Sequence, residues 1–574
     1  MTYAVRALTT AAVGLAQRHN ARLPGLALGT MMLFAAVVIY RSGSGTTFYF
    51  DEWGWFLDRR PWREDIFLEP YNGHLSVFPI VVYKLLFATV GLEDYGVYRA
   101  LLIAVHLACA GLVFVLVRRR VGKLLALAGV VPLLFLGAAW HDLLVAFQIT
   151  FLISIAAGLG AWLALESGGW FAGMLAAVLL VLSLGSSTLG IVFAVALLVE
   201  LVARRPLARL WVGAVPLALY GAWYLDRRDS PQGSTAANGS LSELIPATLP
   251  VTPAFAAEAA GGTLSGLLGL GAEWNRPLFA ATAVVLVWRL LRTTVVSPRL
   301  VSLLAAAFTY WVMLGVFRAG KYAPTESRYL YLGAVLVVLI AAELAAGVTV
   351  GRRGFVVVAL VAVAAAVGNV QGLRQGTFAL QSWSGAVGAR FGALELAGRT
   401  PDPSWSPDPE RLPYVRADTY FQAVRELGSP ALAANEIATR PEPDRQAADA
   451  TLVQALGISG RPGGVPGTPT PRIEGLYGGR LEIQKPCLVV RPLAGAVATV
   501  DAAVPRTGVL VESRGAPIDY HLRSFAAGFS PAPLGTVKSG QRESLLVPAR
   551  PGVAWHARIV SSGRVALCGL RTSP

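Results

Sequence analysis

Two adjacent carboxylates, Asp51 and Glu52, have the surroundings that point most directly to chemistry. They follow a long apolar run and lie inside an aromatic segment, residues 48–55, with the sequence FYFDEWGW. Unpaired charge near a bilayer is costly, so acids at that depth suggest a function. Aromatic walls would desolvate a carboxylate and raise its basicity, which favours proton transfer from a hydroxyl group. The alternative is an interfacial belt of Trp and Tyr beside solvated acids.

Two more groups of polar residues could complete such a site. Asn72 and His74 follow a little further along the chain, and His141, Asp142 and Gln148 lie at a short polar corner between apolar runs. Asp142 has a simpler explanation as well, because aspartate is a common N-cap for the helix that follows it. We therefore expect these side chains to bind the substrate of such a site, with the capping role of Asp142 as the alternative.

A third polar segment, residues 318–329 (RAGKYAPTESRY), carries Lys321 and Arg328 beside Tyr329. On the topology derived below this segment lies outside the membrane, where the positive-inside rule predicts few cations. Cations placed against that bias indicate an anion to be held, and a lipid phosphate is available at that depth. The alternative is a surface pair of Glu326 with Arg328 beside a lysine that reaches the interface.

The composition indicates that a bilayer is the solvent for much of the chain. Of the 574 residues, 55% are hydrophobic and 14% are charged, whereas soluble domains carry about 25% charged residues. The net charge of +15 fits arginines that flank membrane helices. Because no basic stripe is interleaved with aromatic residues, we expect no nucleic-acid partner.

Apolar runs near the ~20 residues that a spanning helix needs predict eleven transmembrane helices. The residues before position 23 are expected to form a cytoplasmic N-terminal segment, 1–22, and the first helix is expected to remain uncleaved. The predicted spans are 23–40, 98–117, 124–139, 143–165, 170–185, 188–203, 207–225, 277–292, 299–317, 329–347 and 354–369.

A twelfth apolar stretch, residues 75–92, decides the topology. If it lies on the outer membrane face, the cytoplasmic connections hold most of the arginine clusters, in agreement with the positive-inside rule. Lys84 within the stretch also suits an interface better than the middle of a bilayer. The sequence therefore predicts a cytoplasmic N-terminus and an extracytoplasmic C-terminus. The clusters are Arg118–Arg120 with Lys123, Arg204 with Arg205 and Arg209, Arg289 with Arg292 and Arg299, and Arg352 with Arg353.

The predicted fold is an α-helical polytopic membrane protein with a C-terminal extracytoplasmic mixed domain. We expect a transmembrane module over 23–369 with a first outer loop at 41–97, then a helical and linker region over 370–471. Loop 226–276 is rich in Ser, Gly, Pro and Ala and predicts irregular structure with one short helix. In the tail, Ala417–Leu427 has a helical pattern, whereas 401–413 is rich in proline.

Short alternating runs after residue 472 predict a small antiparallel β-sandwich over 472–574. Cys487 and Cys568 bracket this region, and they can pair if the tail faces an oxidising compartment. A bridge between the first and last strands would then hold the sandwich closed. The expected strands are 481–484, 487–491, 498–502, 508–512, 520–525, 544–548 and 554–560.

As a set, these features resemble the GT-C superfamily of integral membrane glycosyltransferases, which includes protein O-mannosyltransferases and the aminoarabinose transferases of lipid A. Such enzymes keep an acidic motif in the first outer loop, matched by Asp51 and Glu52, and an interfacial helix, matched by 75–92. They also carry an acid at the outer start of the fourth span, matched by Asp142.

The combination of Asp-Glu-Trp, Asn-Gly-His and Ala-Phe-Gln (residues 146–148) is similar to an uncharacterised actinobacterial branch of that superfamily. The resemblance covers about residues 23–370. The Asn-Gly-His element departs from the mannosyl- and aminoarabinosyl-transferases, so it does not carry over their donor sugar.

The resemblance implies an inverting glycosyltransferase of the bacterial plasma membrane. A polyprenyl-phosphate-linked sugar would be the donor, and a cell-envelope glycan, lipid or protein would be the acceptor. Asp51, or else Glu52, would act as general base, and Arg328 with Lys321 or Tyr329 would hold the phosphate. A divalent cation on Asp51, Glu52 or His74 is compatible with the residues but not required by them.

Three other functions are weighed against this one. A transporter or flippase of lipid-linked glycans would need charged spans or broken helices in matching halves. A glycan polymerase or ligase of another fold would place its cations in a later outer loop. A receptor without catalysis would bind through its tail.

Overall fold

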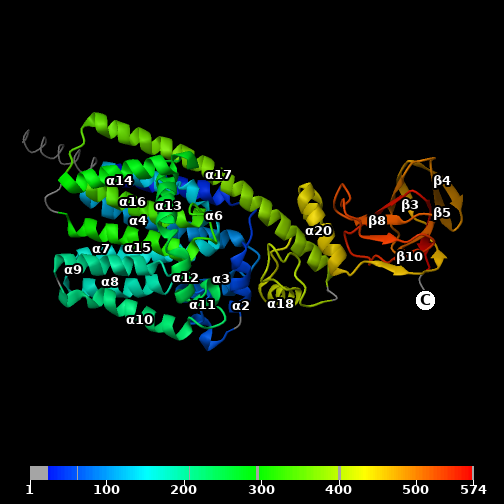
Figure 1. The fold of residues 1–574 in the computed structure, drawn as a ribbon, viewed down its shortest axis with the longest axis horizontal. Helices are drawn as coiled ribbons and strands as arrows, with labels where there is room; N and C mark the ends of the chain where they lie inside the picture. The colour runs from blue at the N-terminus through cyan, green and yellow to red at the C-terminus, as the bar shows by residue number, and fades with distance from the viewer. Residues whose placement is uncertain (1–22, 61, 206, 293–295, 399–401, 572–574) are drawn as a thin grey trace, which may run out of the picture. The chain divides into compact units, whose positions relative to one another are not determined.

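A computed structural model describes residues 23–571 except 61, 206, 293–295 and 399–401 (Figure 1). The expected cytoplasmic segment 1–22 lies outside the described residues. The chain divides into two compact units. The first comprises Met1–Ser44, Asp58–Val90 and Asp94–Gln381, and the second comprises Gly45–Leu57, Gly91–Glu93 and Ser382–Pro574.

Every predicted apolar run falls on a helix. Apart from the last, the helices begin and end near the run boundaries, because their apolar faces continue along each run. They are Leu23–Ser42, α4 (Tyr95–Val121), α5 (Lys123–Leu134), α7 (Ile149–Glu166), α8 (Gly169–Leu184), α9 (Gly190–Arg204), α10 (Trp211–Arg227), α14 (Asn275–Arg292), α15 (Pro298–Arg318), α16 (Leu330–Leu344) and α17 (Arg352–Ala397).

Six of the described helices are long and apolar enough to cross a bilayer. A seventh span is added if the bent pair Lys123–Leu134 and Gly137–Leu144 is one crossing. The chain is therefore a multi-pass membrane protein. The number eleven stays a prediction, because α8, α9 and α10 have 16, 15 and 17 residues, fewer than the ~20 that a perpendicular span needs.

The apolar stretch 75–92 forms α3 (Val77–Thr89), a helix of 13 residues. This length is too short to cross hydrocarbon. Its Lys84 ammonium donates to the carbonyl oxygen of Arg60 at 2.9 Å and lies 4.6 Å from the ring centroid of Trp62. The lysine is thus held by polar and aromatic partners, and the interfacial position of α3 stays a prediction.

A network of ion pairs ties together the arginine-rich ends of several helices. The buried carboxylate of Glu200 accepts from the indole N–H of Trp162 at 2.8 Å and from the guanidinium of Arg299 at 2.9 Å. Arg204 lies 2.8 Å from its other oxygen. Such pairing is what a charge inside an apolar bundle requires. Further pairs in the same network are Arg119, Arg120 and Arg299 with Glu166, and Arg120 with Glu343.

The predicted irregular loop 226–276 is wrong in its main feature. It contains α11 (Ser234–Asn238), α12 (Leu241–Thr248) and α13 (Thr252–Leu267), and α13 is largely buried. Its small residues, including Gly261 and Gly262, let neighbouring backbone approach closely. A Cβ on Gly261 would lie 2.4 Å from the carbonyl oxygen of Asn275. Composition alone suggested a loop because small residues serve turns and tight helix packing equally well.

The expected end of a helix near residue 369 is also wrong. α17 continues without a break for 46 residues, Arg352–Ala397. At a rise of 1.5 Å per residue this is roughly 69 Å, about twice the thickness of a hydrocarbon core. The segments beyond it are α18 (Ala417–Leu427), α19 (Ala434–Thr439) and α20 (Glu442–Ala455). The bounds of α18 match the predicted helix.

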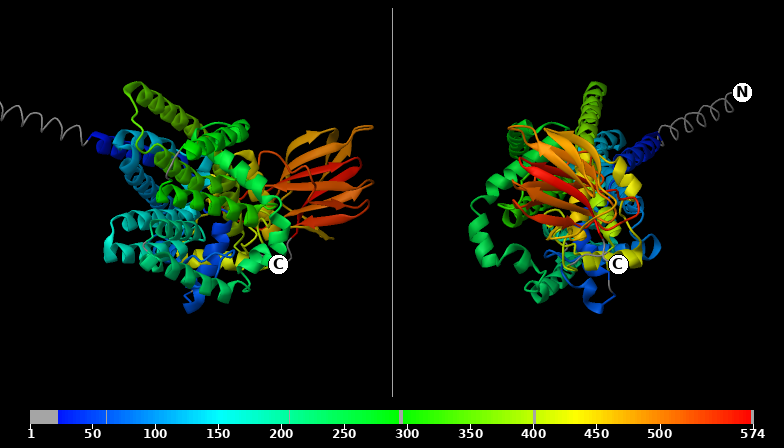
Figure 2. Two further views of the ribbon diagram at one scale, coloured as in Figure 1. Left: turned by 60° about the vertical axis from the view of Figure 1, so that its left-hand side comes forward. Right: turned by 90° about the vertical axis from the view of Figure 1, so that its right-hand side faces the viewer.

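The C-terminal part of the second unit forms two antiparallel sheets, drawn in orange and red in Figure 2. Their strand orders are β1-β10-β7-β12-β5-β4, with β2 beside β12, and β3-β6-β11-β8-β9. The bounds are β1 (Gly460–Pro462), β2 (Pro466–Gly467), β3 (Arg472–Tyr477), β4 (Gly479–Gln484), β5 (Cys487–Pro492), β6 (Ala498–Ala503), β7 (Val509–Arg514), β8 (Ile518–Arg523), β9 (Gly535–Val537), β10 (Arg542–Leu545), β11 (His556–Ser561) and β12 (Arg564–Leu570).

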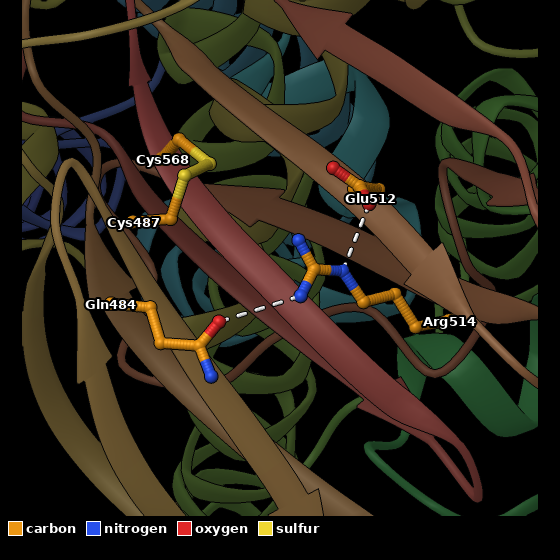
Figure 3. The surroundings of a disulfide bond; sticks show 5 residues. All are labelled: Gln484, Cys487, Glu512, Arg514 and Cys568. Atoms are coloured by element: carbon orange, nitrogen blue, oxygen red, sulfur yellow. Dashed lines mark hydrogen bonds and ion pairs between the residues drawn. A yellow bond between two sulfur atoms is a disulfide. The ribbon is translucent and has the colours of Figure 1, made fainter.

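Each of the seven predicted strand segments overlaps a strand, but the sequence analysis missed β1, β2, β3, β9 and β12. Of these, β12 lies between β7 and β5 in the centre of its sheet. Residues Val565–Leu570 are all buried, so the strand lacks the alternation that marks a half-exposed one. A disulfide joins Cys487 to Cys568 (Figure 3). These residues are direct partners in the register of β5 with β12, so the bridge links neighbouring strands within one sheet.

Two acids of α20 attach the helix to these sheets. Asp449 accepts the backbone N–H groups of Phe525 and Ala526 at 2.8 and 3.0 Å. Glu442 accepts those of Ala527 and Gly528 at 3.0 and 2.9 Å. The acids are seven residues apart and so lie on one helix face. The helical segment is therefore fastened to the sheets by four consecutive amides.

Replacing Glu200 by Ala should destabilise the first unit by about 3–5 kcal/mol, because Arg299 would be left buried without this carboxylate. Thermal unfolding of the purified protein in detergent measures the loss. The matched control is Glu243→Ala, which removes an exposed glutamate from α12 and should leave the unfolding midpoint unchanged. Equal midpoints for both variants would show that the network does not stabilise the bundle.

Candidate active site

A cavity of about 410 Å³ lies inside the first unit, at the end of α15 opposite to the ion-pair network. It brings together residues from the three remote segments 72–74, 142 and 328–329. Its polar lining includes Asn72, His74, Asp142, Thr188, Asn238, Tyr310, Arg318, Arg328 and Tyr329. Its apolar walls come from α7, α9, α10, α15 and α16, and include Phe151, Ile155, Ile191, Leu217, Met313, Phe317 and Leu332.

The Asn-Gly-His element is a tight turn that presents His74 to the cavity. Tyr71 and His74 exchange backbone hydrogen bonds of 3.1 and 2.9 Å, and the residues between them have positive φ, 49° at Asn72 and 79° at Gly73. Asn-Gly is the preferred sequence for such a two-residue turn. The Gly73 amide donates to the carbonyl of Gln232 at 3.0 Å, which fixes the turn against the segment before α11.

His74 is neutral and holds one of the two cavity arginines. Its Nδ1 lies 3.0 Å from the hydroxyl of Thr188 and its Nε2 lies 3.2 Å from the guanidinium of Arg318. A guanidinium only donates, so Nε2 must accept and Nδ1 carries the proton that is donated to Thr188. Burial, with Arg318 and Arg328 nearby, lowers the pKa of His74 to about 3.

Arg318 and Arg328 form a cationic end to the cavity. The Arg328 guanidinium lies 4.5 Å from the ring centroid of Tyr322 and 5.5 Å from that of Tyr329. The Arg318 guanidinium lies 5.9 Å from the Tyr322 ring. Stacking on aromatic faces orients a guanidinium without cancelling its charge. Neither Tyr322 nor neutral His74 is an anion, so Arg318 keeps charge to offer to a ligand.

Asp142 supplies a buried carboxylate to the same cavity. The residue is 1% exposed, and neither carboxylate oxygen has a hydrogen-bond partner among the described residues. It lies within α6 (Trp140–Leu144) and caps neither that helix nor α7, whose N-caps are Ala139 and Gln148. The capping alternative is therefore wrong. A buried polar group without partners costs roughly 1–3 kcal/mol. This cost makes the Asp142 carboxylate a candidate for binding a ligand.

Three other predicted site residues lie away from this lining. His141 hydrogen-bonds Ser327 and faces a neighbouring cavity. The Lys321 ammonium donates to the carbonyl of Ala237 at 2.9 Å and so fastens α11. Gln148 is buried just before α7 and does not appear in the described lining.

Several lining residues were not chosen from the sequence, among them Arg318 and Thr188. Arg318 opens the cationic segment 318–329, and its position as the last residue of α15 was the signal that could have found it. Thr188 lies in the polar break between α8 and α9. Its Ser-Ser-Thr sequence is as typical of a turn as of a site, so the sequence offered no means of separating the two.

Asp51 and Glu52 begin α2 (Asp51–Arg59) in the second unit. The Glu52 side chain is fully buried and accepts the backbone N–H of Tyr49 at 3.0 Å, whereas Asp51 is half-buried. This contact gives Glu52 a structural role. Within the described residues, no group of three or more His, Cys, Asp or Glu side chains is placed to hold a metal ion.

The lining suits an amphiphile with an anionic head. Two guanidinium groups can offset the charge of a phosphate, and the carboxylate and Asn72 can accept or donate hydrogen bonds to hydroxyl groups. The apolar walls between the helices suit a hydrocarbon chain. The fold and this cavity thus define a multi-pass membrane protein with an internal cavity that has a cationic end and apolar walls.

Comparison with known proteins finds similarity among solved structures. No family model matches the chain, and no curated protein matches it. Among solved structures, the chain is similar to ArnT from Cupriavidus metallidurans bound to undecaprenyl phosphate, with a TM-score of 0.41 and 14% sequence identity over 70% of this chain and 88% of that one. Similarity at this level leaves the function to be argued from the site itself.

Stability should fall as the pH is lowered from about 6.5 towards 3, in part because the unfolded chain protonates His74 and the native state does not. One such proton contributes a slope of up to ~1.4 kcal/mol per pH unit. The His74→Gln variant should show a shallower slope when its thermal unfolding is measured at pH 7, 6 and 5. Parallel curves for wild type and variant would mean that the native histidine binds protons normally.

Proposed function

We propose that this protein is a membrane glycosyltransferase. It transfers a sugar from a polyprenyl-phosphate donor to a cell-envelope glycan, lipid or protein at the outer face of the membrane. One observation carries the proposal: a single cavity combines two arginines, a buried carboxylate without partners and long apolar walls. A phosphate, a sugar and a polyprenyl chain are the chemical groups that match these three parts.

The reaction is a single displacement at the anomeric carbon. An acceptor hydroxyl oxygen forms a bond to that carbon while the bond from the carbon to the phosphate oxygen breaks. A carboxylate takes the hydroxyl proton, and the polyprenyl phosphate leaves with its negative charge. Arg318 and Arg328 stabilise that charge as it develops. Attack opposite to the leaving group inverts the anomeric configuration.

Asp51 is our candidate for the general base. Asp142 and Asn72 orient hydroxyl groups of the bound sugar, and Tyr329 borders the phosphate. His74 is a positioning residue, because it holds the Arg318 guanidinium through Nε2. Keeping this imidazole neutral matters to the site, since a third positive charge there would repel both arginines.

The first test incubates purified protein with a panel of polyprenyl-phosphate sugars and an envelope extract, and measures the release of polyprenyl phosphate. Arg328→Met and Arg318→Met should each lower kcat/KM by about 10- to 100-fold, because a hydrogen bond to a charged group contributes about 1.5–3 kcal/mol. Arg353→Met is the matched control, because Arg353 is an exposed arginine near the start of α17. Movement of labelled lipid across vesicles without any release would favour a flippase instead.

The second test separates the two aspartates. Asp51→Asn should lower kcat by about 10²–10⁴-fold with little effect on donor binding, as expected for loss of a general base. Asp142→Asn should mainly raise KM, because it still fills its place but loses a charged acceptor. Near-normal turnover by Asp51→Asn, together with a collapse of kcat in Asp142→Asn, would transfer the role of base to Asp142.

A further inference from the structure

A second cavity, of about 740 Å³, lies beside the first within the first unit. The two cavities share a wall made of two short segments, 141–142 and 327–328. His141 and Ser327 line the second cavity, whereas the next residue of each pair, Asp142 and Arg328, lines the first. His141 and Ser327 are hydrogen-bonded to each other, so this bond joins the two segments of the wall.

The lining of the second cavity differs in charge from that of the first. It offers the side-chain amides of Gln371 and Gln375, the hydroxyl of Thr325, the carboxylate of Glu326 and the aromatic ring of Trp140. No lysine or arginine occurs among the described residues that line it. Amides, hydroxyls and a carboxylate are partners for neutral hydroxyl groups, while the acid disfavours an anionic ligand.

The walls of this cavity are built from close backbone packing. A Cβ on Gly137 would lie 1.8 Å from the carbonyl oxygen of Asn369, and one on Gly376 would lie 2.2 Å from the Trp140 ring. The Asn369 amide donates to the carbonyl of Ala365 at 3.0 Å. α17 can approach the segment 137–140 this closely only because glycines lie at the contacts. The backbone therefore determines the shape of the cavity.

We infer that the second cavity binds an uncharged carbohydrate, which is the acceptor of the transfer. The role of this carbohydrate as the acceptor rests on the proposed function, whereas the binding of a neutral sugar rests on the lining alone. The volume falls within the roughly 300–1,000 Å³ of small-molecule sites. The phosphate lies in the first, cationic cavity and the sugar lies in the second. Across the shared wall, the two ligands contact adjacent residues of the same two segments.

Binding is tested on the full chain in lipid nanodiscs by saturation-transfer NMR. The probes are methyl α-mannoside, methyl β-galactoside, maltose and lactose, with methyl glucuronide as the charged comparison. Neutral probes should bind and methyl glucuronide should bind more weakly. Gln371→Ala combined with Gln375→Ala should weaken binding by about 10-fold, since two hydrogen bonds of about 1 kcal/mol each are lost.

A blocking variant makes the test specific to this cavity. Ala323 is exposed at the rim and lines the cavity, so Ala323→Trp should abolish binding without disturbing the core. Ala208→Trp is the matched control, because Ala208 is an exposed alanine near the arginine-rich end of α9. Both variants should unfold at the wild-type temperature, which shows that the loss reflects a filled cavity.

The outcomes separate this inference from the proposed function. Failure of every neutral probe to bind, binding that Ala323→Trp leaves intact, or a preference for methyl glucuronide would each overturn the carbohydrate site. If neutral sugars bind and Ala323→Trp blocks them, yet no donor releases polyprenyl phosphate, the carbohydrate site stands and the transferase proposal fails.

Discussion

A charge buried in an apolar bundle is costly unless an ion pair or a bound ligand compensates it. This constraint applies at both ends of α15. At its beginning, Arg299 is matched by Glu200 at 2.9 Å. At its end, Arg318 is held by neutral His74 and by the ring of Tyr322, and neither contact cancels its charge. One helix thus connects a closed ion-pair network, which fixes the bundle, to a site that has positive charge left for a ligand.

Two cavities of opposite character can share a wall because the wall is made of short helical turns. Successive residues of a helix point about 100° apart, so His141 and Asp142 face different cavities, as do Ser327 and Arg328. The polar corner therefore has two uses. One residue of each pair closes the wall through a hydrogen bond, and the other offers charge to the first cavity.

The second unit is held together by carboxylates in a different way. Asp449 and Glu442 accept four consecutive backbone amides, which makes α20 and the sheets one body. The Glu52 carboxylate accepts a hydrogen bond from the backbone N–H of Tyr49. Acids that look equivalent in the sequence therefore differ in what they are free to do. Asp142, in the first unit, is buried, and neither of its carboxylate oxygens has a hydrogen-bond partner among the described residues.

The sequence by itself determined the bilayer environment, the positions of the apolar helices, the helix Ala417–Leu427 and most strands. These depend on local composition and periodicity, which a single chain displays directly. Only the tertiary structure decided that residues 252–267 form a buried helix, that α17 runs through to Ala397 and that β12 lies between β7 and β5. It also decided that His74 is neutral and that Arg318 belongs to the cavity. Each of these depends on which remote segments pack together, because burial and nearby charge come from neighbours in space.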